Sequence, residues 1–296
     1  MREESSGMQG PVTGVRELQL PTVSFVGNLS FPEAPRWRAG QLWFSDMVAK
    51  RLCTVDAGGT VRTLARFDEM PGGIGFLPDG TPLVVATTSA RVLAVRDGRA
   101  EVYAELRDVA RGHCDDMAVA VDGTAYVGVV GKVTADMQRA PSGGAIVRVT
   151  PAGRVSRDAE DLAFPNGAVV TDKRMLLVNE TFAERVTAFD IADDGSLTGR
   201  RTWARLPGMH PDGLAVDIDG AAWVGCYREG KFVRVVEGGE VTDVISTGGR
   251  WATGVELGGP DGTTLFVCTA DTDLRRFLRG DSTGRIDAVS VDIGAG

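Results

Sequence analysis

Apolar and polar residues alternate along most of this chain, in short runs that end at Asp-Gly, Gly-Gly or similar pairs. Alternation with a period of two is typical of β-strands that bury one face, and a Gly-containing pair between two such runs is typical of a hairpin. A sustained helical spacing of apolar residues is not found. The pattern therefore predicts an all-β protein built from antiparallel hairpins.

The alternating runs recur as copies of one sequence unit. The clearest copy, residues 212–225, contains two apolar strands around an Asp-Gly turn. The first positions of all six copies are Glu33, Gly72, Asp115, Asn166, Asp212 and Thr253. These positions are 39 to 51 residues apart, and each copy continues into two further alternating segments. Four strands per repeat of this length are typical of a propeller blade. The sequence predicts a six-bladed β-propeller with four antiparallel strands per blade.

One propeller accounts for nearly the whole chain. Residues 1–20 are polar and are expected to form a flexible N-terminal tail, and residues 21–296 to form a single domain. Residues 22–29 and residues 285–293 both have the pattern of an outer, fourth strand. We expect one end of the chain to complete the blade made by the other end, and the sequence leaves open which end does so.

The first positions of the repeats contain the candidate chemistry. In a propeller the first strand of each blade lines the central channel, so residues that begin these strands converge. Glu33, Asp115 and Asp212 are acids and Asn166 is an amide. Carboxylates held together repel one another or bind protons unless a cation lies among them. Such oxygen ligands predict one divalent metal ion, Ca²⁺ first, with Mg²⁺, Mn²⁺ or Zn²⁺ as alternatives. The other interpretation is that these residues only form turns.

Two further features are expected at the mouth of the channel. The longest connection between second and third strands, residues 131–144, is expected to cover the channel and to bring Met137 and Arg139 to a substrate; a solvated loop is the alternative. His113 and His210 each lie two residues before a first position. Because histidine exchanges protons near neutral pH, His113 is a candidate substrate contact or proton shuttle, whereas His210 fits a structural role in its turn.

Charge and composition narrow the class of partner. The 296 residues include 32 Lys and Arg against 40 Asp and Glu, which gives a net charge of −8. Nucleic acids and anionic membranes attract basic surfaces, so neither is expected and a small molecule is. No apolar stretch is long enough for a membrane span, and the four cysteines lack Cys-x-x-Cys spacing. We therefore expect a cytoplasmic protein with free thiols.

Several segments together resemble the family of six-bladed propellers that includes senescence marker protein, gluconolactonase and luciferin-regenerating enzyme. The likeness extends over residues 25–272. It is strongest in Glu-Ala-Pro-Arg-Trp at 33–37, Phe-Pro-Asn-Gly at 164–167, Pro-Asp-Gly-Leu-Ala-Val at 211–216 and Thr-Gly-Val-Glu at 253–256. The resemblance implies that Glu33, Asn166 and Asp212 are the three ligands of one catalytic divalent metal, and that the protein hydrolyses a lactone or a related ester.

One segment departs from the gluconolactonase pattern. Members of that type carry Arg-x-Asn-Asp-Gly on the third blade, where it binds sugar hydroxyls, whereas this chain has His-Cys-Asp-Asp-Met at 113–117. The bidentate Arg donor is absent and an acid replaces the amide, which argues against a sugar lactone. Other lactonases of the family are similar in having Asp-Asp-Met here.

The sequence supports a metal-dependent lactonase as the leading hypothesis. Water bound to the metal would attack the lactone carbonyl, and Asp212 or Asp115 would orient that water and take its proton. His113, Asp115 and Arg139 are the candidate substrate contacts. Two alternatives stay open: the same site could act on another bond, in an organophosphate or a biosynthetic reaction, or the protein could be a non-catalytic calcium-binding propeller.

Overall fold

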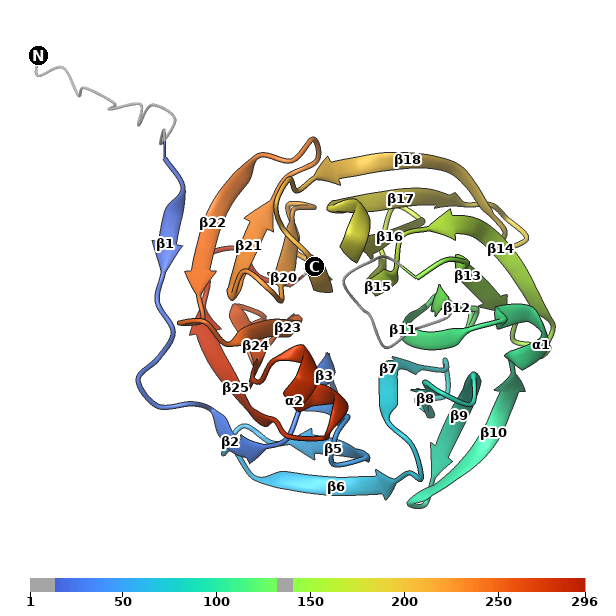
Figure 1. The fold of residues 1–296 in the computed structure, drawn as a ribbon, viewed down its shortest axis with the longest axis horizontal. Helices are drawn as coiled ribbons and strands as arrows, with labels where there is room; N and C mark the ends of the chain where they lie inside the picture. The colour runs from blue at the N-terminus through green and yellow to red at the C-terminus, as the bar shows by residue number, and fades with distance from the viewer. Residues whose placement is uncertain (1–13, 132–140, 296) are drawn as a thin grey trace, which may run out of the picture.

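A computed structural model describes residues 14–131 and 141–295 of the chain. Six antiparallel sheets surround a central axis, which confirms the predicted six-bladed β-propeller (Figure 1). In five blades all four strands follow one another along the chain, and the first strand lies innermost. No helix in the described part of the chain is both long and apolar enough to cross a membrane.

The first three blades are formed by residues 32–162. Blade one consists of β3 (Pro32–Arg38), β4 (Gln41–Asp46), β5 (Arg51–Val55) and β6 (Val61–Arg66). Blade two consists of β7 (Pro71–Phe76), β8 (Pro82–Ala86), β9 (Arg91–Arg96) and β10 (Arg99–Glu105). Blade three consists of β11 (His113–Val119), β12 (Ala125–Gly131), β13 (Gly144–Val149) and β14 (Val155–Leu162). A short helix, α1 (Arg107–Ala110), connects the second blade to the third.

The other three blades use the rest of the chain and its N-terminal part. Blade four consists of β15 (Pro165–Val170), β16 (Met175–Glu180), β17 (Arg185–Ile191) and β18 (Leu197–Arg205), with a 3-10 turn, η1 (Thr181–Ala183), after its second strand. Blade five consists of β19 (Pro211–Val216), β20 (Ala222–Cys226), β21 (Lys231–Val235) and β22 (Val241–Ser246). Blade six consists of β23 (Trp251–Gly258), β24 (Thr264–Asp271), β25 (Thr283–Ser290) and β2 (Val26–Leu29), with helix α2 (Leu274–Leu278) before β25.

The N-terminal part of the chain closes the ring. Strand β2 pairs antiparallel with β25, so it is the outermost strand of blade six. The interpretation of residues 285–293 as a fourth strand is therefore wrong: β25 pairs with β24 over eight residue pairs and is the third strand. The reason is that residues 272–282 form α2 and its loop and no strand, so the next alternating run, β25, pairs directly with β24.

Part of the predicted tail also lies against the propeller. Strand β1 (Arg16–Leu18) pairs in parallel with β22 as a fifth strand of blade five. The Arg16 guanidinium forms ion pairs with Asp243 and Asp292. Residues 1–13 lie outside the described residues, so the division into a tail and one domain stays a prediction.

Apolar side chains are buried mainly between neighbouring blades. Each of the six blade-to-blade contacts has its own core cluster; the cluster between blades six and one, for example, includes Val26, Leu29, Phe44 and Cys268. Alternation along each strand makes this possible, because it supplies one apolar face to the preceding blade and one to the following blade. The blades therefore hold one another around the axis, and the inner strands keep fixed positions.

Each inner strand is irregular at its candidate position. In β11, Cys114 pairs with Val129 and Met117 pairs with Val127, so β11 has one more residue than β12 over this stretch. The same one-residue shift occurs in the first strands of the other five blades. A β-bulge bends its strand and redirects a side chain. Six bulges at one level therefore place the first positions of the repeats around the axis together.

Candidate active site

The four polar residues predicted to converge do so at one end of the channel. Glu33 on β3, Asp115 on β11 and Asn166 on β15 line a cavity of about 320 Å³. Asp212 on β19 accepts a hydrogen bond from the amide of Asn166, and its charge raises the pKa of both Glu33 and Asp115. Residues that are far apart in the sequence thus form one polar floor beneath the cavity.

Glycine lets the inner strands approach closely at this level. A Cβ atom on Gly167 would lie 2.3 Å from the carbonyl oxygen of Asp212, and one on Gly213 would lie 2.5 Å from the carbonyl oxygen of Thr253. Real Cβ atoms do not come so close to backbone, so only glycine permits these contacts. The fully buried Asn179 side chain donates to the carbonyl oxygens of Asp212 and Gly213, at 2.8 and 3.1 Å. The backbone around Asp212 is therefore held from both sides.

The acids at the floor favour their protonated forms as long as no cation balances their negative charge. Burial, and then the charge of Asp212, raise the pKa of Glu33 well above its ordinary value. Burial and the charges of Asp212 and Asp116 do the same for the pKa of Asp115. Burial raises the pKa of Asp212 to about 7, although the Asn166 hydrogen bond lowers it. Carboxyl groups with this behaviour are common at functional sites.

The donor set fits a hard divalent cation. No Lys or Arg of the described residues forms an ion pair with Glu33, Asp115 or Asp212. Two partly buried carboxylates and a buried amide, Glu33, Asp212 and Asn166, offer the oxygen ligands that such a cation prefers. Within residues 14–131 and 141–295, no three side chains of the His, Cys, Asp and Glu types form a metal-binding group. Asp115, at the equivalent position on β11, lines the same cavity as Glu33 and Asn166.

Arg36 and Asp116 were missed by the sequence analysis. Arg36 of blade one donates to the Asp116 carboxylate of blade three at 3.1 Å, and Asp116 also accepts from the backbone N–H groups of Met117 at 2.8 Å and Ala168 at 3.3 Å. One sequence signal was present, because Asp116 occupies the repeat position that is Gly167 in blade four. This ion pair crosses the channel and links three blades next to the acids.

The two histidines differ in position. His113 is exposed and lines the cavity beside Asp115. The Nδ1 atom of His210 lies 2.8 Å from Glu229 Oε1, and the backbone N–H of His210 donates to Oε2 of the same carboxylate, also at 2.8 Å. These contacts fit the structural role expected for His210. Met137 and Arg139 lie outside the described residues, so their predicted contacts with substrate are not placed.

The cavity walls above the acids are apolar, which the sequence analysis did not predict. Aromatic side chains from four blades and the apolar residues of α2 face it, Trp251 and Phe277 among them. Phe31, Phe164 and Trp251 each lie two residues before a first position of the repeat, whereas Phe277 belongs to a helix that only blade six contains. Two signals were present in the sequence: the shared place of these three residues in the repeat, and the length of the connection between β24 and β25.

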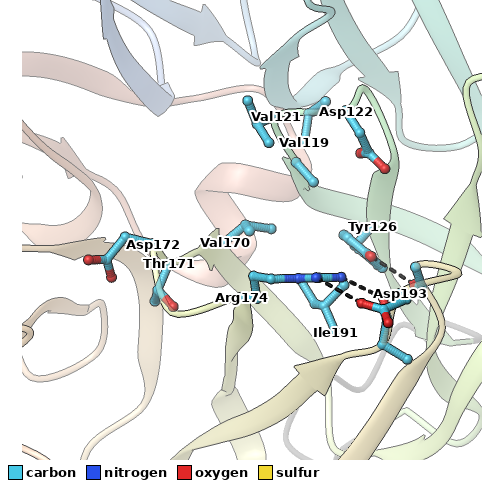
Figure 2. A pocket seen from close by; sticks show the side chains of 13 residues that line it. Val119, Val121, Asp122, Tyr126, Val170, Thr171, Asp172, Arg174, Ile191 and Asp193 are labelled. Carbon is cyan, nitrogen blue, oxygen red and sulfur yellow. Dashed lines mark hydrogen bonds and ion pairs between the residues drawn. The ribbon is translucent and has the colours of Figure 1, made fainter.

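A second cavity, of about 490 Å³, lies at the other end of the strands (Figure 2). It is lined by hairpin turns of blades three and four, which include Val121 and Asp172. Figure 2 shows the ion pair between Arg174 and Asp193, with N and O atoms 3.0 Å apart, at its side. None of the first positions of the repeats lines this cavity, so it is separate from the candidate active site.

Comparisons with known proteins agree with this architecture. A family model described as "SMP-30/Gluconolactonase/LRE-like region" matches residues 31–271. A 6-deoxy-6-sulfogluconolactonase of Pseudomonas putida is 28% identical over 246 residues, which cover 80% of this chain and 82% of that protein. Regucalcin of Bos taurus is 24% identical over 264 residues, which cover 86% of this chain and 88% of that protein. The structure of a calcium-binding protein, regucalcin, from Agrobacterium tumefaciens has a TM-score of 0.79 at 18% identity, over 95% of this chain and 97% of that one.

Proposed function

The chain belongs to the SMP-30/gluconolactonase/LRE-like family, and we propose that it is a metal-dependent hydrolase that opens a lactone or a related ester. The observation that carries the proposal is the convergence of Glu33, Asn166 and Asp212 as oxygen donors at the floor of one cavity. The similarity to a protein named as a lactonase supports the reaction class. The size of the cavity, about 320 Å³, suits a small molecule as substrate.

Glu33, Asn166 and Asp212 would hold one divalent cation, with Ca²⁺ as the expected ion. When bound, such a cation polarises a carbonyl oxygen and acidifies water in the site. Support for this assignment comes from the donor chemistry, since these residues present carboxylate and amide oxygens and no described Lys or Arg forms an ion pair with either carboxylate.

The residues of the chain would carry out the proton transfers of the reaction. A water molecule attacks the lactone carbonyl carbon, and the Asp212 carboxylate takes its proton. The ring C–O bond then breaks and the same proton passes to the leaving alkoxide, so that lactone and water give a hydroxy acid. Asp115 orients the water from β11, and His113 contacts the substrate at the cavity wall. Arg139 is the remaining predicted substrate contact.

Substitution of the proposed ligands tests this assignment. We expect Glu33→Ala, Asn166→Ala and Asp212→Ala to lower metal-dependent lactone hydrolysis by about 10²-fold or more, since loss even of groups that only orient metal ligands costs 10 to 100-fold. The assay follows acid release from lactones after chelation and re-addition of Ca²⁺, Mg²⁺, Mn²⁺ or Zn²⁺. Glu240→Ala removes an exposed acid in a hairpin turn and is the matched control. Full metal-dependent activity in folded Glu33 and Asp212 variants would refute the assignment.

A second candidate function is a non-catalytic calcium-binding propeller, which the similarity to a regucalcin described as calcium-binding favours. The same experiments separate the two functions. Tight Ca²⁺ binding that raises the melting temperature, without turnover of lactones, simple esters or phosphotriesters, would support the binding function. If only phosphotriesters are hydrolysed, the proposed site stands, but the bond that it breaks is a phosphoester bond rather than a lactone or carboxylic ester bond.

A further inference from the structure

Aromatic rings form a continuous series around one side of the cavity. We call this series the aromatic belt; it consists of Phe164, Phe182, His210, Tyr227, Trp251, Phe277 and Phe31. In that order, the centroids of successive rings are 5.5, 6.3, 6.0, 5.0, 6.2 and 4.7 Å apart. These distances are typical of interacting aromatic pairs. All members except His210 line the cavity, so its wall offers several ring faces and edges to a ligand.

Helix α2 lies near the central axis of the propeller (Figure 1), and it completes the apolar wall of the cavity. Its apolar residues Leu274, Phe277 and Leu278 line the cavity. Its polar residues attach it to the blade: Asp273 accepts from the backbone N–H groups of Arg275 and Arg276, and the Arg276 side chain forms ion pairs within 3.1 Å to both ends of the connection. The helix is thus held by its polar contacts while its apolar side faces the cavity.

Above the floor, the polar side chains of the described wall that remain for a polyhydroxylated ligand are Thr88 and His113, on blades two and three, and neither belongs to the aromatic belt. The hydroxyl groups of Thr87 and Thr181 already donate to the carbonyl oxygens of Met70 and Pro211, at 3.0 and 2.8 Å. The Arg228 guanidinium lies over two rings of the belt, 5.7 Å from the centroid of Phe182 and 5.5 Å from that of Tyr227. A sugar ring would bury hydroxyl groups against these rings without partners, which costs free energy for each unpaired group.

We propose that the substrate is a lactone, or a related ester, whose ring carries a bulky apolar substituent, and that the aromatic belt and α2 bind this substituent. The inference rests on the proposed function, because it places the reacting carbonyl at the floor formed by Glu33, Asn166 and Asp212. The substituent then points along the wall toward Trp251, Phe277 and Leu278. Aromatic substituents suit the site best, because the belt offers ring edges and faces at stacking distance.

A series of γ-lactones tests the substrate class. With the ring constant, kcat/KM is expected to rise by about fourfold for each methylene added to the side chain until the cavity is filled. A phenyl-substituted γ-lactone should be hydrolysed faster than gluconolactone. Faster hydrolysis of gluconolactone than of every alkyl and aryl lactone would overturn the inference.

Binding without turnover is the second measurement. A phenyl-substituted γ-lactam, which keeps the shape but resists hydrolysis, should change the tryptophan fluorescence of the wild type and should do so much less in Trp251→Phe. If lactones are not hydrolysed and the lactam still binds, the proposed function fails while the apolar site stands. If gluconolactone is hydrolysed and the lactam does not bind, the proposed function stands and this inference fails.

Variants of α2 give the third measurement. We expect Phe277→Ala and Leu278→Asp to lower the preference for the phenyl-substituted over the unsubstituted lactone by about tenfold, mainly through KM. Val102→Asp is the matched control for Leu278→Asp, because both side chains are about half exposed, at 52% and 56%, and Val102 lies on the outer strand of blade two. An unchanged preference in both folded α2 variants would contradict the proposed role of the helix.

Discussion

At the residue scale, equivalent positions of the repeat serve different purposes. Glu33, Asn166 and Asp212 present side chains to the cavity floor. Thr253 instead donates its hydroxyl to the carbonyl oxygen of Pro32 at 3.1 Å, which helps to join the last blade to the first. Gly72 leaves room for the backbone of Asp115. The repeat thus makes the positions equivalent in space, while the residue types divide them between the polar floor of the cavity and the closure of the ring.

Glu256 provides a test of electrostatics at this scale. Burial raises its pKa to about 7, the Arg36 charge opposes this and the Asp116 charge adds to it. In the unfolded chain its pKa is near 4.5, so the native state holds the extra proton and loses stability as pH rises from 4.5 to about 7. Glu256→Gln cannot ionise and is spared this loss. Its free energy of unfolding relative to the wild type should therefore be higher at pH 8 than at pH 5, by on the order of 2 kcal/mol.

Urea unfolding of both proteins at the two pH values measures this difference. Because the comparison is between variant and wild type, the titration of all other groups largely cancels. If Glu256→Gln and the wild type differ in free energy of unfolding by the same amount at both pH values, the pKa of Glu256 is not raised.

At the element scale, β2 is the piece on which ring closure depends. It is only four residues long, yet Val26 and Leu29 are each 5% exposed and belong to the core between blades six and one. Sequence reasoning identified the alternating run but not its partner strand, because the pairing of β2 with β25 joins residues about 260 positions apart. Helix α2 escaped prediction because five residues are too few to show a helical period.

Substitution in β2 should therefore destabilise the whole propeller. Val26→Asp would bury an unpaired charge and is expected to lower the free energy of unfolding by about 3 kcal/mol or more. Val23→Asp, where the wild-type side chain is 79% exposed, is the control and should change it by less than about 0.5 kcal/mol. Chemical denaturation followed by circular dichroism gives both values. Equal effects of the two substitutions would mean that β2 does not close the ring.

At the scale of the whole molecule, contacts across the channel join blades that are not neighbours. Arg36 of blade one also donates to the carbonyl oxygen of Met117 in blade three at 3.1 Å, in addition to its ion pair with Asp116. Both side chains are mostly buried, with 18% and 12% of their surfaces exposed. This link, next to the inner strands of blades one and three, sets the spacing of the polar floor.

Breaking this link should therefore lower the free energy of unfolding more than the loss of an exposed ion pair would. Asp116→Ala leaves Arg36 without its carboxylate and is expected to lower the free energy of unfolding by about 3 to 5 kcal/mol. In the double variant Arg36→Met with Asp116→Ala, the loss should be smaller than the sum of the single losses, because no unpaired charge remains. Urea denaturation of the four proteins gives the coupling energy. Additive losses would exclude a direct interaction across the channel.

The local sequence pattern was sufficient to predict the blades and their number, because alternation and repeat length can be recognised in short segments. It also predicted that Glu33, Asp115, Asn166 and Asp212 converge, because a propeller places equivalent repeat positions around one axis. Three features depended on tertiary contacts: which end closes the ring, the Arg36 and Asp116 link, and the aromatic belt. Each joins residues that lie far apart along the chain, and only the belt residues two positions before Glu33, Asn166, Asp212 and Thr253 share a repeat position. Such contacts depend on loop paths and on the packing of whole blades, which no local period of the sequence encodes.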